Sequence, residues 1–124
     1  MIRGGMPTIF VTDMSRAVEF YCGALGLALK QRWGDHFAAI DAGDGLLLGL
    51  HPASPTAPPP GTSGSIQIGL NVDAKLDDVV EQLRARGVKF RGPIVDDPEG
   101  GVRIAFLADP DGNDLYLCEV KHSW

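Results

Sequence analysis

The sequence is poor in cysteine, in basic residues and in long apolar runs, and each shortage narrows what the protein can be. Two cysteines among 124 residues, Cys22 and Cys118, form no CxxC pair and no metal-binding spacing, so we expect reduced thiols that pack as small apolar side chains. Lys and Arg number 11 against 16 Asp and Glu, a formal net charge of -5. This balance argues against nucleic acid or an anionic membrane as a partner.

Segments that would direct the chain to a membrane or out of the cell are also missing from the sequence. No apolar run reaches the length needed to span a bilayer. The residues from Met1 to Asp13 contain no apolar stretch of the kind found in signal peptides. We therefore expect a cytoplasmic protein. The sequence also lacks a phosphate-binding loop, a dinucleotide fingerprint and a nucleophile elbow.

What is present suits one small domain. A chain of 124 residues with 44% hydrophobic and 22% charged residues can bury a core without disulfides or metals. The first half predicts a strand over 7–11, a helix that begins after Thr12-Asp13 and ends before Gly26, and three further strands. The predicted three strands cover 28–33, 36–42 and 46–51.

A proline-rich segment, 52–64, holds five of the nine prolines and is predicted to link two halves. After it the same order returns: a strand over 66–72, a helix over 76–86 that follows Asp73, and three more strands. Those strands are predicted at 88–90, 102–107 and 114–120.

The two halves are related by one constant shift in numbering. Val11 at the end of the first strand corresponds to Val72 (72 − 11 = 61), and Gly26 at the helix end corresponds to Gly87 (87 − 26 = 61). A duplication of this kind indicates two copies of one structural unit. The sequence therefore predicts an α+β fold of two tandem βαβββ modules, residues 6–51 and 65–120, within one domain spanning 1–124. The curved mixed sheets would enclose a cavity and the helices would lie outside.

Three segments resemble the vicinal oxygen chelate superfamily, which includes glyoxalases, bleomycin resistance proteins and dioxygenases. They are the opening FVTDMSRAVEFY of residues 10–21, the second-module segments Val72-Asp73 and 80–88, and the closing LADPDGN of residues 107–113. The resemblance covers nearly the whole chain. It implies the fold but not one activity, because members include isomerases, ring-cleaving dioxygenases and drug-binding proteins.

Metal-dependent members of this family hold one divalent ion with a His or Gln from the first strand and a Glu from the last strand of each module. Counting from the shared motifs, the corresponding positions here are Met6, Gly49, Gln67 and Tyr116. A thioether is a poor ligand for a hard cation and glycine offers no side chain, which leaves Gln67 as the single suitable ligand. We therefore predict no metal site and no cofactor. If a divalent ion (Zn, Ni, Fe or Mn) is bound, Gln67 and His51 are its expected ligands.

Strand alternation gives the residues expected to face the cavity. Trp33 ends a strand and either covers the mouth of the cavity or takes part in ordinary packing or a dimer contact. The lining combines aromatic, small and neutral polar side chains, which suits an organic molecule better than an ion. His51 shares a face with Gly49, so it is a candidate for lining the cavity. The alternative is that His51 lies at a strand end, partly solvated and without a function. The predicted ligand-binding residues are Thr8, Phe10, Trp33, Gly49, His51, Gln67, Tyr116 and Cys118.

Three functions remain open on the sequence. The first is a metal-free binder of a small organic molecule, similar to the drug-sequestering members of the family, for which the resemblance also implies a homodimer. The second is an enzyme that resembles lactoylglutathione lyase or a dioxygenase and uses an atypical metal site. The third is an accessory subunit that uses the fold for protein contacts.

Overall fold

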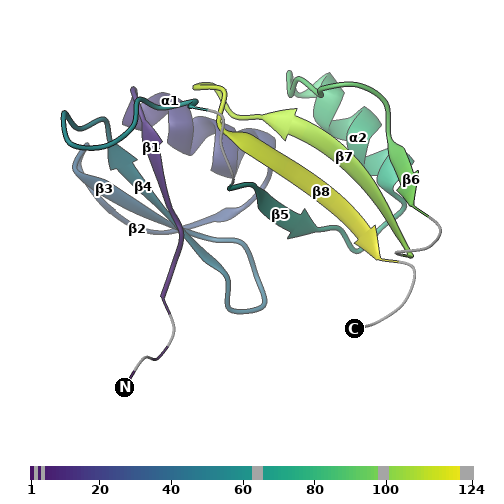
Figure 1. Ribbon diagram of the computed structural model, residues 1–124, viewed down its shortest axis with the longest axis horizontal. Helices are drawn as coiled ribbons and strands as arrows, with labels where there is room; N and C mark the ends of the chain where they lie inside the picture. The colour runs from purple at the N-terminus through teal and green to yellow at the C-terminus, as the bar shows by residue number, and fades with distance from the viewer. Residues whose placement is uncertain (2, 4, 63–65, 98–100, 121–124) are drawn as a thin grey trace. The chain divides into compact units, whose positions relative to one another are not determined.

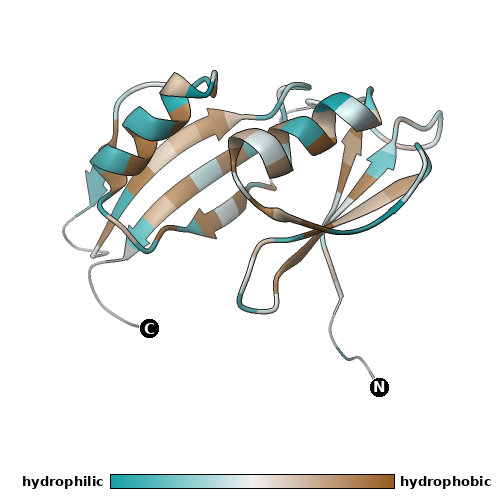
Figure 2. Cartoon of the chain, turned by 180° about the vertical axis from the view of Figure 1, so that it is seen from behind, coloured by the Kyte–Doolittle hydropathy of each residue, from teal (hydrophilic) through white to brown (hydrophobic). Residues whose placement is uncertain are grey.

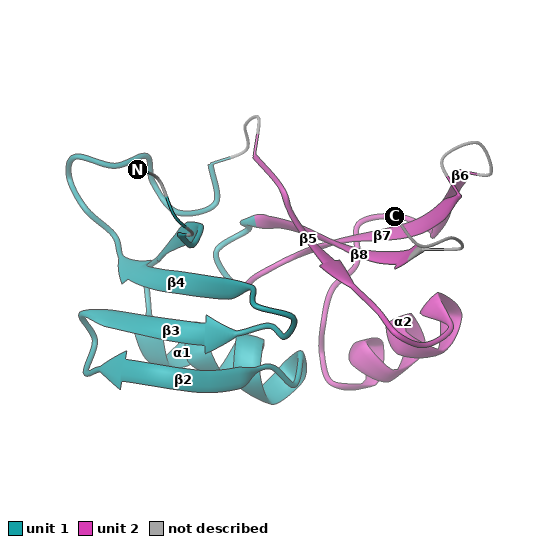
Figure 3. Cartoon of the chain, turned by 90° about the horizontal axis from the view of Figure 1, so that it is seen from below, with its two compact units in different colours: residues 1–62, 110–113 teal, residues 63–109, 114–124 magenta. Residues whose placement is uncertain are grey.

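The computed structural model describes residues 1, 3, 5–62, 66–97 and 101–120, and the chain divides into two compact units (Figure 3). Unit 1 comprises residues 1–62 and 110–113, and unit 2 comprises residues 63–109 and 114–124. Within the described residues, no helix is long and apolar enough to cross a membrane.

Unit 1 contains a mixed sheet of four strands in the order β1-β4-β3-β2 (Figure 1). β1 pairs in parallel with β4, and the pairs β4–β3 and β3–β2 are antiparallel. Tight turns separate the antiparallel strands because the sequence supplies glycines with positive φ there, at Gly34, Gly43 and Gly45. The strands are β1 (Thr8–Val11), β2 (Ala28–Trp33), β3 (Phe37–Asp41) and β4 (Leu47–Pro52).

The helical segment of unit 1 changes type part-way along. It begins as α1 (Met14–Val18), whose N-cap Asp13 accepts a hydrogen bond from the backbone of Arg16 at 3.0 Å, as the sequence predicted. It then continues as a π-helix, η1 (Glu19–Ala24), which sequence periodicity did not reveal. Gly26 follows the C-cap with φ 76°, the conformation expected of a glycine that ends a helix.

The core of unit 1 lies between this helical segment and one face of the sheet. Alternate strand residues are deeply buried, and Tyr21 of η1 is fully buried with them. On the helix side the buried strand residues are Ile9, Val11, Ala38, Ile40, Leu48 and Leu50, and Ala39 and Gly49 between them are buried as well. Strand alternation places the other side chains of each strand on the opposite face, on which neither of the described helices of unit 1 packs.

Unit 2 repeats the topology of unit 1, with strand order β5-β8-β7-β6 and β5 parallel to β8. The sequence duplication therefore corresponds to a duplication of structure, as predicted. The strands are β5 (Ile68–Asn71), β6 (Val95–Asp97), β7 (Val102–Ala108) and β8 (Asp114–Val120).

The edge of the second sheet differs from the sequence prediction. The expected strand over 88–90 is wrong: only an isolated bridge joins Phe90 to Leu107, and the edge strand is β6 instead. Gly92, with φ 83°, and Pro93 lie between the two pairings and interrupt the ladder. β6 was missed because Val95-Asp96-Asp97 is too short and too polar to show a strand pattern, and all three residues are exposed.

The helix of unit 2, α2 (Leu76–Ala85), has an apolar side buried on the sheet and a polar side outside (Figure 2). Its N-terminus is capped from a distance, because Glu119 Oε1 of β8 accepts a hydrogen bond from the backbone of Leu76 at 2.6 Å. Asp73, which precedes the helix, is not its N-cap. A carboxylate at this end also interacts favourably with the helix dipole.

Residues 110–113 of the turn between β7 and β8 belong to unit 1 and are held by side-chain hydrogen bonds. Asp111 accepts from the backbone and the hydroxyl of Thr12, at 3.1 and 2.5 Å. Asn113 accepts from Gly61 N at 2.9 Å and donates to Phe10 O at 3.1 Å. This turn is the DPDGN motif, so its polar residues fix the backbone at the end of β1.

Candidate functional site

The candidate site of unit 1 is the sheet face opposite its helix, which we call the unit 1 open face. Register identifies its members, because residues paired across neighbouring strands project to the same side. Thr8 pairs with Gly49 and Gly49 with Ala39, Phe10 pairs with His51, and Phe37 pairs with Trp33. The structure therefore brings five of the predicted site residues onto one face: Thr8, Phe10, Trp33, Gly49 and His51.

Aromatic and thioether groups surround Gly49 at the centre of this face. A Cβ on Gly49 would lie 3.0 Å from Phe37 Cζ and 3.2 Å from Met6 Sδ. The ring of Phe37 is also 5.7 Å from that of Trp33, centroid to centroid. Trp33 is 54% exposed. The face thus presents ring surface to solvent, with a glycine where a side chain would meet the Phe37 ring.

Sequence reasoning missed Phe37 as a member of this face. The strand prediction that began at His36 already contained the necessary alternation, since Phe37 and Ala39 share a side. His36 itself is exposed in the turn before β3. Phe37 therefore belongs with the predicted residues as a candidate contact.

His51 is held in one orientation by two contacts. Its Nδ1 lies 2.8 Å from Pro52 O, and its ring meets Phe10 edge-on with centroids 5.4 Å apart. A carbonyl oxygen can only accept, so Nδ1 carries the proton of this bond. The ring is thus positioned at the end of β4 by its own strand and by β1, and it is only part-buried.

Unit 2 has a corresponding open face, on which Tyr116 takes the central place. Tyr116 pairs with Gly69 and with Phe106, and Cys118 pairs with Asn71. The Tyr116 ring covers Gly69, where a Cβ would lie only 2.2 Å from Tyr116 Cζ. Cys118 is buried, and this burial raises the pKa of its thiol, which makes it a weak nucleophile.

Gln67 departs from the prediction that it lies inside a strand. β5 begins one residue later, at Ile68, and Gln67 is exposed before it. Of the three predicted unit 2 residues, the structure therefore places Tyr116 and Cys118 on the open face, while Gln67 precedes the paired region.

The side chains at the positions that the family resemblance assigned to metal ligands do not form a suitable donor set. The position in β4 is Gly49, closely approached by Phe37 and Met6, and the position in β8 is Tyr116, whose ring lies over Gly69. A thioether, a phenol and one amide are a poor set for Zn²⁺, Ni²⁺, Fe²⁺ or Mn²⁺. Across the described ranges, no group of three or more His, Cys, Asp or Glu side chains is arranged to hold a metal ion.

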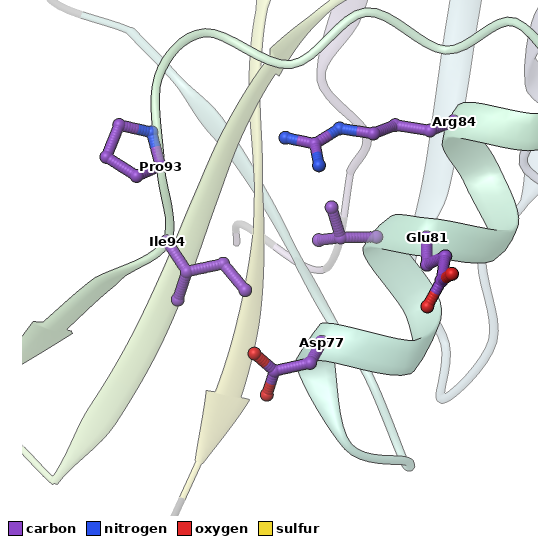
Figure 4. Close-up of a pocket in the computed structure, with 6 residues that line it drawn as sticks. Asp77, Glu81, Arg84, Pro93 and Ile94 are labelled. Atoms are coloured by element: carbon purple, nitrogen blue, oxygen red, sulfur yellow. The ribbon is translucent and has the colours of Figure 1, made fainter.

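A separate cleft of about 460 Å³ lies in unit 2 between α2 and the segment before β6 (Figure 4). Val80 and Ile94 form its apolar part, and Asp77 and Arg84 lie at its two ends. Asp77 is paired with Arg103 at 2.6 Å, and the hydrogen bond from Arg103 lowers the pKa of this carboxyl. Because the Asp77 carboxylate is already paired with Arg103, the cleft is a weaker candidate for a binding site than the unit 1 open face.

A smaller cleft, of about 330 Å³, lies in unit 1 beside the start of α1. Its walls are mostly polar, and Thr12 and Asp13 already bond to Asp111 and Arg16. Its residues are Thr12, Asp13, Met14, Ser15, Asp35 and Pro52. None was predicted as a site residue.

Comparison with known proteins gives the same family over nearly the whole chain. Residues 5–117 match the model of the Glyoxalase/Bleomycin resistance protein/Dioxygenase superfamily. An uncharacterized protein of Mycolicibacterium smegmatis is 31% identical over 111 residues, which are 89% of this chain and 87% of that protein.

Solved structures of the same fold include proteins described with different roles. The antibiotic binding protein TnmS3 from Streptomyces sp. CB03234 has a TM-score of 0.74 at 29% identity, covering 97% of this chain and 98% of its own. A lactoylglutathione lyase from Agrobacterium tumefaciens has a TM-score of 0.73 at 20% identity, covering 97% and 96%. At that lower identity, the second likeness concerns the fold alone.

Proposed function

Because this chain belongs to the glyoxalase/bleomycin resistance protein/dioxygenase superfamily, we propose that it binds a small, flat organic molecule without a metal ion, as a drug-sequestering or similar protein. The observation that carries the proposal is the surrounding of Gly49. The family position for a metal-binding carboxylate has no side chain here, and a Cβ at that position would lie 3.0 Å from Phe37 Cζ and 3.2 Å from Met6 Sδ. This exchange replaces a charge that would attract a cation with apolar surface that would contact an organic ring.

Two further observations support a binding role. The Trp33 and Phe37 rings form one aromatic surface with Trp33 half exposed, which is the type of surface on which a planar molecule stacks. TnmS3, described as an antibiotic binding protein, has a similar structure that covers 97% of this chain. We expect the protein to act in the cytoplasm as a homodimer.

A metal-dependent lyase, isomerase or dioxygenase is the second candidate, and one observation favours it. The Nδ1 atom of His51 donates to a backbone carbonyl, an arrangement that in metalloproteins orients Nε2 toward an ion. His51 belongs to unit 1 and the other candidate ligand, Gln67, belongs to unit 2. Two such ligands alone are a weak set for a divalent ion.

Ligand binding at the open face can be measured by the fluorescence of Trp33. The sequence has two tryptophans, so a Trp124→Phe background leaves Trp33 as the single one. A panel of aromatic and thiol-conjugate compounds is screened by thermal shift, and each stabilising compound is titrated against Trp33 emission. We expect saturable quenching. Trp33→Ala should raise the ligand concentration needed for the same thermal shift about tenfold, the usual cost of losing one stacked ring.

Leu29→Ala is the matched control, because Leu29 lies on the same strand and is similarly exposed but pairs with Ile40 of the buried face. It should leave ligand affinity unchanged. If no compound stabilises the protein or quenches Trp33, the binding proposal is wrong.

Metal analysis separates the two candidates. The protein is equilibrated with Zn²⁺, Ni²⁺, Fe²⁺ or Mn²⁺, dialysed, and analysed for metal per chain. The binding proposal expects a trace amount that His51→Ala and Gln67→Ala leave unchanged. One ion per chain, lost in either variant, would establish the enzyme candidate instead.

A further inference from the structure

We infer that the organic ligand of the unit 1 open face carries an aromatic hydroxyl group, which donates a hydrogen bond to Nε2 of His51. This inference rests on the proposed function and makes it more specific, since it names the polar group that such a ligand needs.

The first step is the tautomer of His51. Nδ1 lies 2.8 Å from the carbonyl oxygen of Pro52. Because a carbonyl has no proton to donate, the hydrogen of that bond belongs to Nδ1. In the neutral imidazole the other nitrogen, Nε2, then carries a lone pair and acts as a hydrogen-bond acceptor.

The second step is the accessibility of Nε2. Among the described residues, Pro52 is the hydrogen-bond partner of the His51 ring. Since no fully buried side-chain nitrogen or oxygen of those residues lacks a partner, Nε2 is not fully buried. It is also the ring nitrogen farther from the backbone. The edge-on contact with Phe10 holds the ring, and Asn113 in turn binds the backbone of Phe10.

The third step concerns the surroundings of this acceptor. Aromatic and thioether groups cover the neighbouring part of the face, because Met6 and Phe37 lie against Gly49 and the ring of Trp33 lies against that of Phe37. The carboxylate of Asp41, at the end of β3, accepts from Gly43 N at 2.8 Å. His51 shares this face with Gly49, so a flat ligand that covers the rings and reaches Nε2 would remove solvent from that acceptor and would have to supply a hydrogen bond to it. A neutral hydroxyl on the ring does so without the desolvation cost of a charged donor.

The experiment compares two ligands that differ by one donor hydrogen, 2-naphthol and 2-methoxynaphthalene. Their dissociation constants are measured by calorimetry or equilibrium dialysis for the wild-type chain, His51→Phe and His36→Phe. His51→Phe keeps an aromatic ring beside Phe10 and removes the acceptor. His36→Phe is the control, because His36 is exposed in the turn before β3.

We expect the wild-type chain and His36→Phe to prefer 2-naphthol about tenfold, as one hydrogen bond predicts, and His51→Phe to lose that preference. Equal affinity of the wild-type chain for the two compounds, or a preference that survives in His51→Phe, would overturn the inference and leave the proposed function standing. Failure of both compounds to bind the wild-type chain counts against the proposed function itself.

A measurement that needs no variant supports or overturns the same inference. The ring nitrogens of His51 are observed by long-range proton–nitrogen NMR in the wild-type chain at neutral pH. Protonation at Nδ1 is expected, with a shift of the Nε2 resonance when 2-naphthol is added. Protonation at Nε2 instead would remove the acceptor and with it the inference.

Discussion

The ring of Tyr116 lies across Gly69 of the neighbouring strand, so that a Cβ on Gly69 would be 2.2 Å from Tyr116 Cζ and 2.4 Å from its Oη. The two residues pair in the register of β5 and β8. Only a residue without a side chain permits this overlap, and the phenol occupies the space that the missing side chain leaves.

Replacing Gly69 by alanine should displace the Tyr116 ring and destabilise the fold by about 1–2 kcal/mol, the usual cost of overpacking. The cost is limited because the atoms approached are at the far end of the Tyr116 side chain. Urea unfolding measures the free energy. In a Tyr116→Ala background the same change should cost nothing measurable, and an equal cost in both backgrounds would show that the ring is not the cause.

Restoring a carboxylate at Gly49 should not restore a metal site. We expect Gly49→Glu to lower the free energy of unfolding by about 2–3 kcal/mol, because the new side chain meets Phe37 and Met6. Metal content and chemical denaturation are measured together. A Gly49→Glu chain that binds one divalent ion and gains stability from it would contradict this prediction.

Asn113→Ala should destabilise the chain by about 2 kcal/mol, because Gly61 N and Phe10 O each lose a hydrogen-bond partner. Thermal and urea unfolding report the loss. Asn71→Ala is a suitable control, since Asn71 is an exposed residue of β5. Equal stability of the two variants would mean that the side chain of Asn113 does not hold the end of β1.

The Asp77–Arg103 pair predicts a pH-dependent difference in stability. The hydrogen bond from Arg103 holds the pKa of Asp77 below its ordinary value of 3.8. A lowered pKa means that the pair stabilises the fold above that ordinary value and that the stabilisation is lost as the pH falls through the folded-state pKa. We expect Asp77→Asn to melt below wild type at neutral pH, with a smaller gap in strong acid.

Asp78→Asn is the matched control for this pair, because both carboxylates lie in the first turn of α2 and only Asp77 is bonded to Arg103. Melting curves over an acid-to-neutral pH series give the comparison. If the difference in melting temperature between Asp77→Asn and Asp78→Asn does not change with pH, the Asp77–Arg103 pair is not its cause.

Much of the candidate site followed from residue order because strand faces obey a period of two. Thr8, Phe10, Gly49 and His51 were assigned to one side of their strands from alternation, and the register agrees. Phe37 was overlooked although the same rule applies to it. The edge strand β6 could not be predicted, since its three exposed residues pair only because β7 offers them a partner.

The local chemistry of the chain was enough to determine the repeated order of strand and helix, the glycine turns and the capping by Asp13, because each depends on residues a few positions apart. Tertiary structure alone decided which distant groups meet. Glu119 caps α2, Asn113 holds Phe10, and Phe37 and Met6 crowd Gly49. Such contacts depend on strand register and side-chain rotamers, which bring together atoms that residue order leaves unrelated.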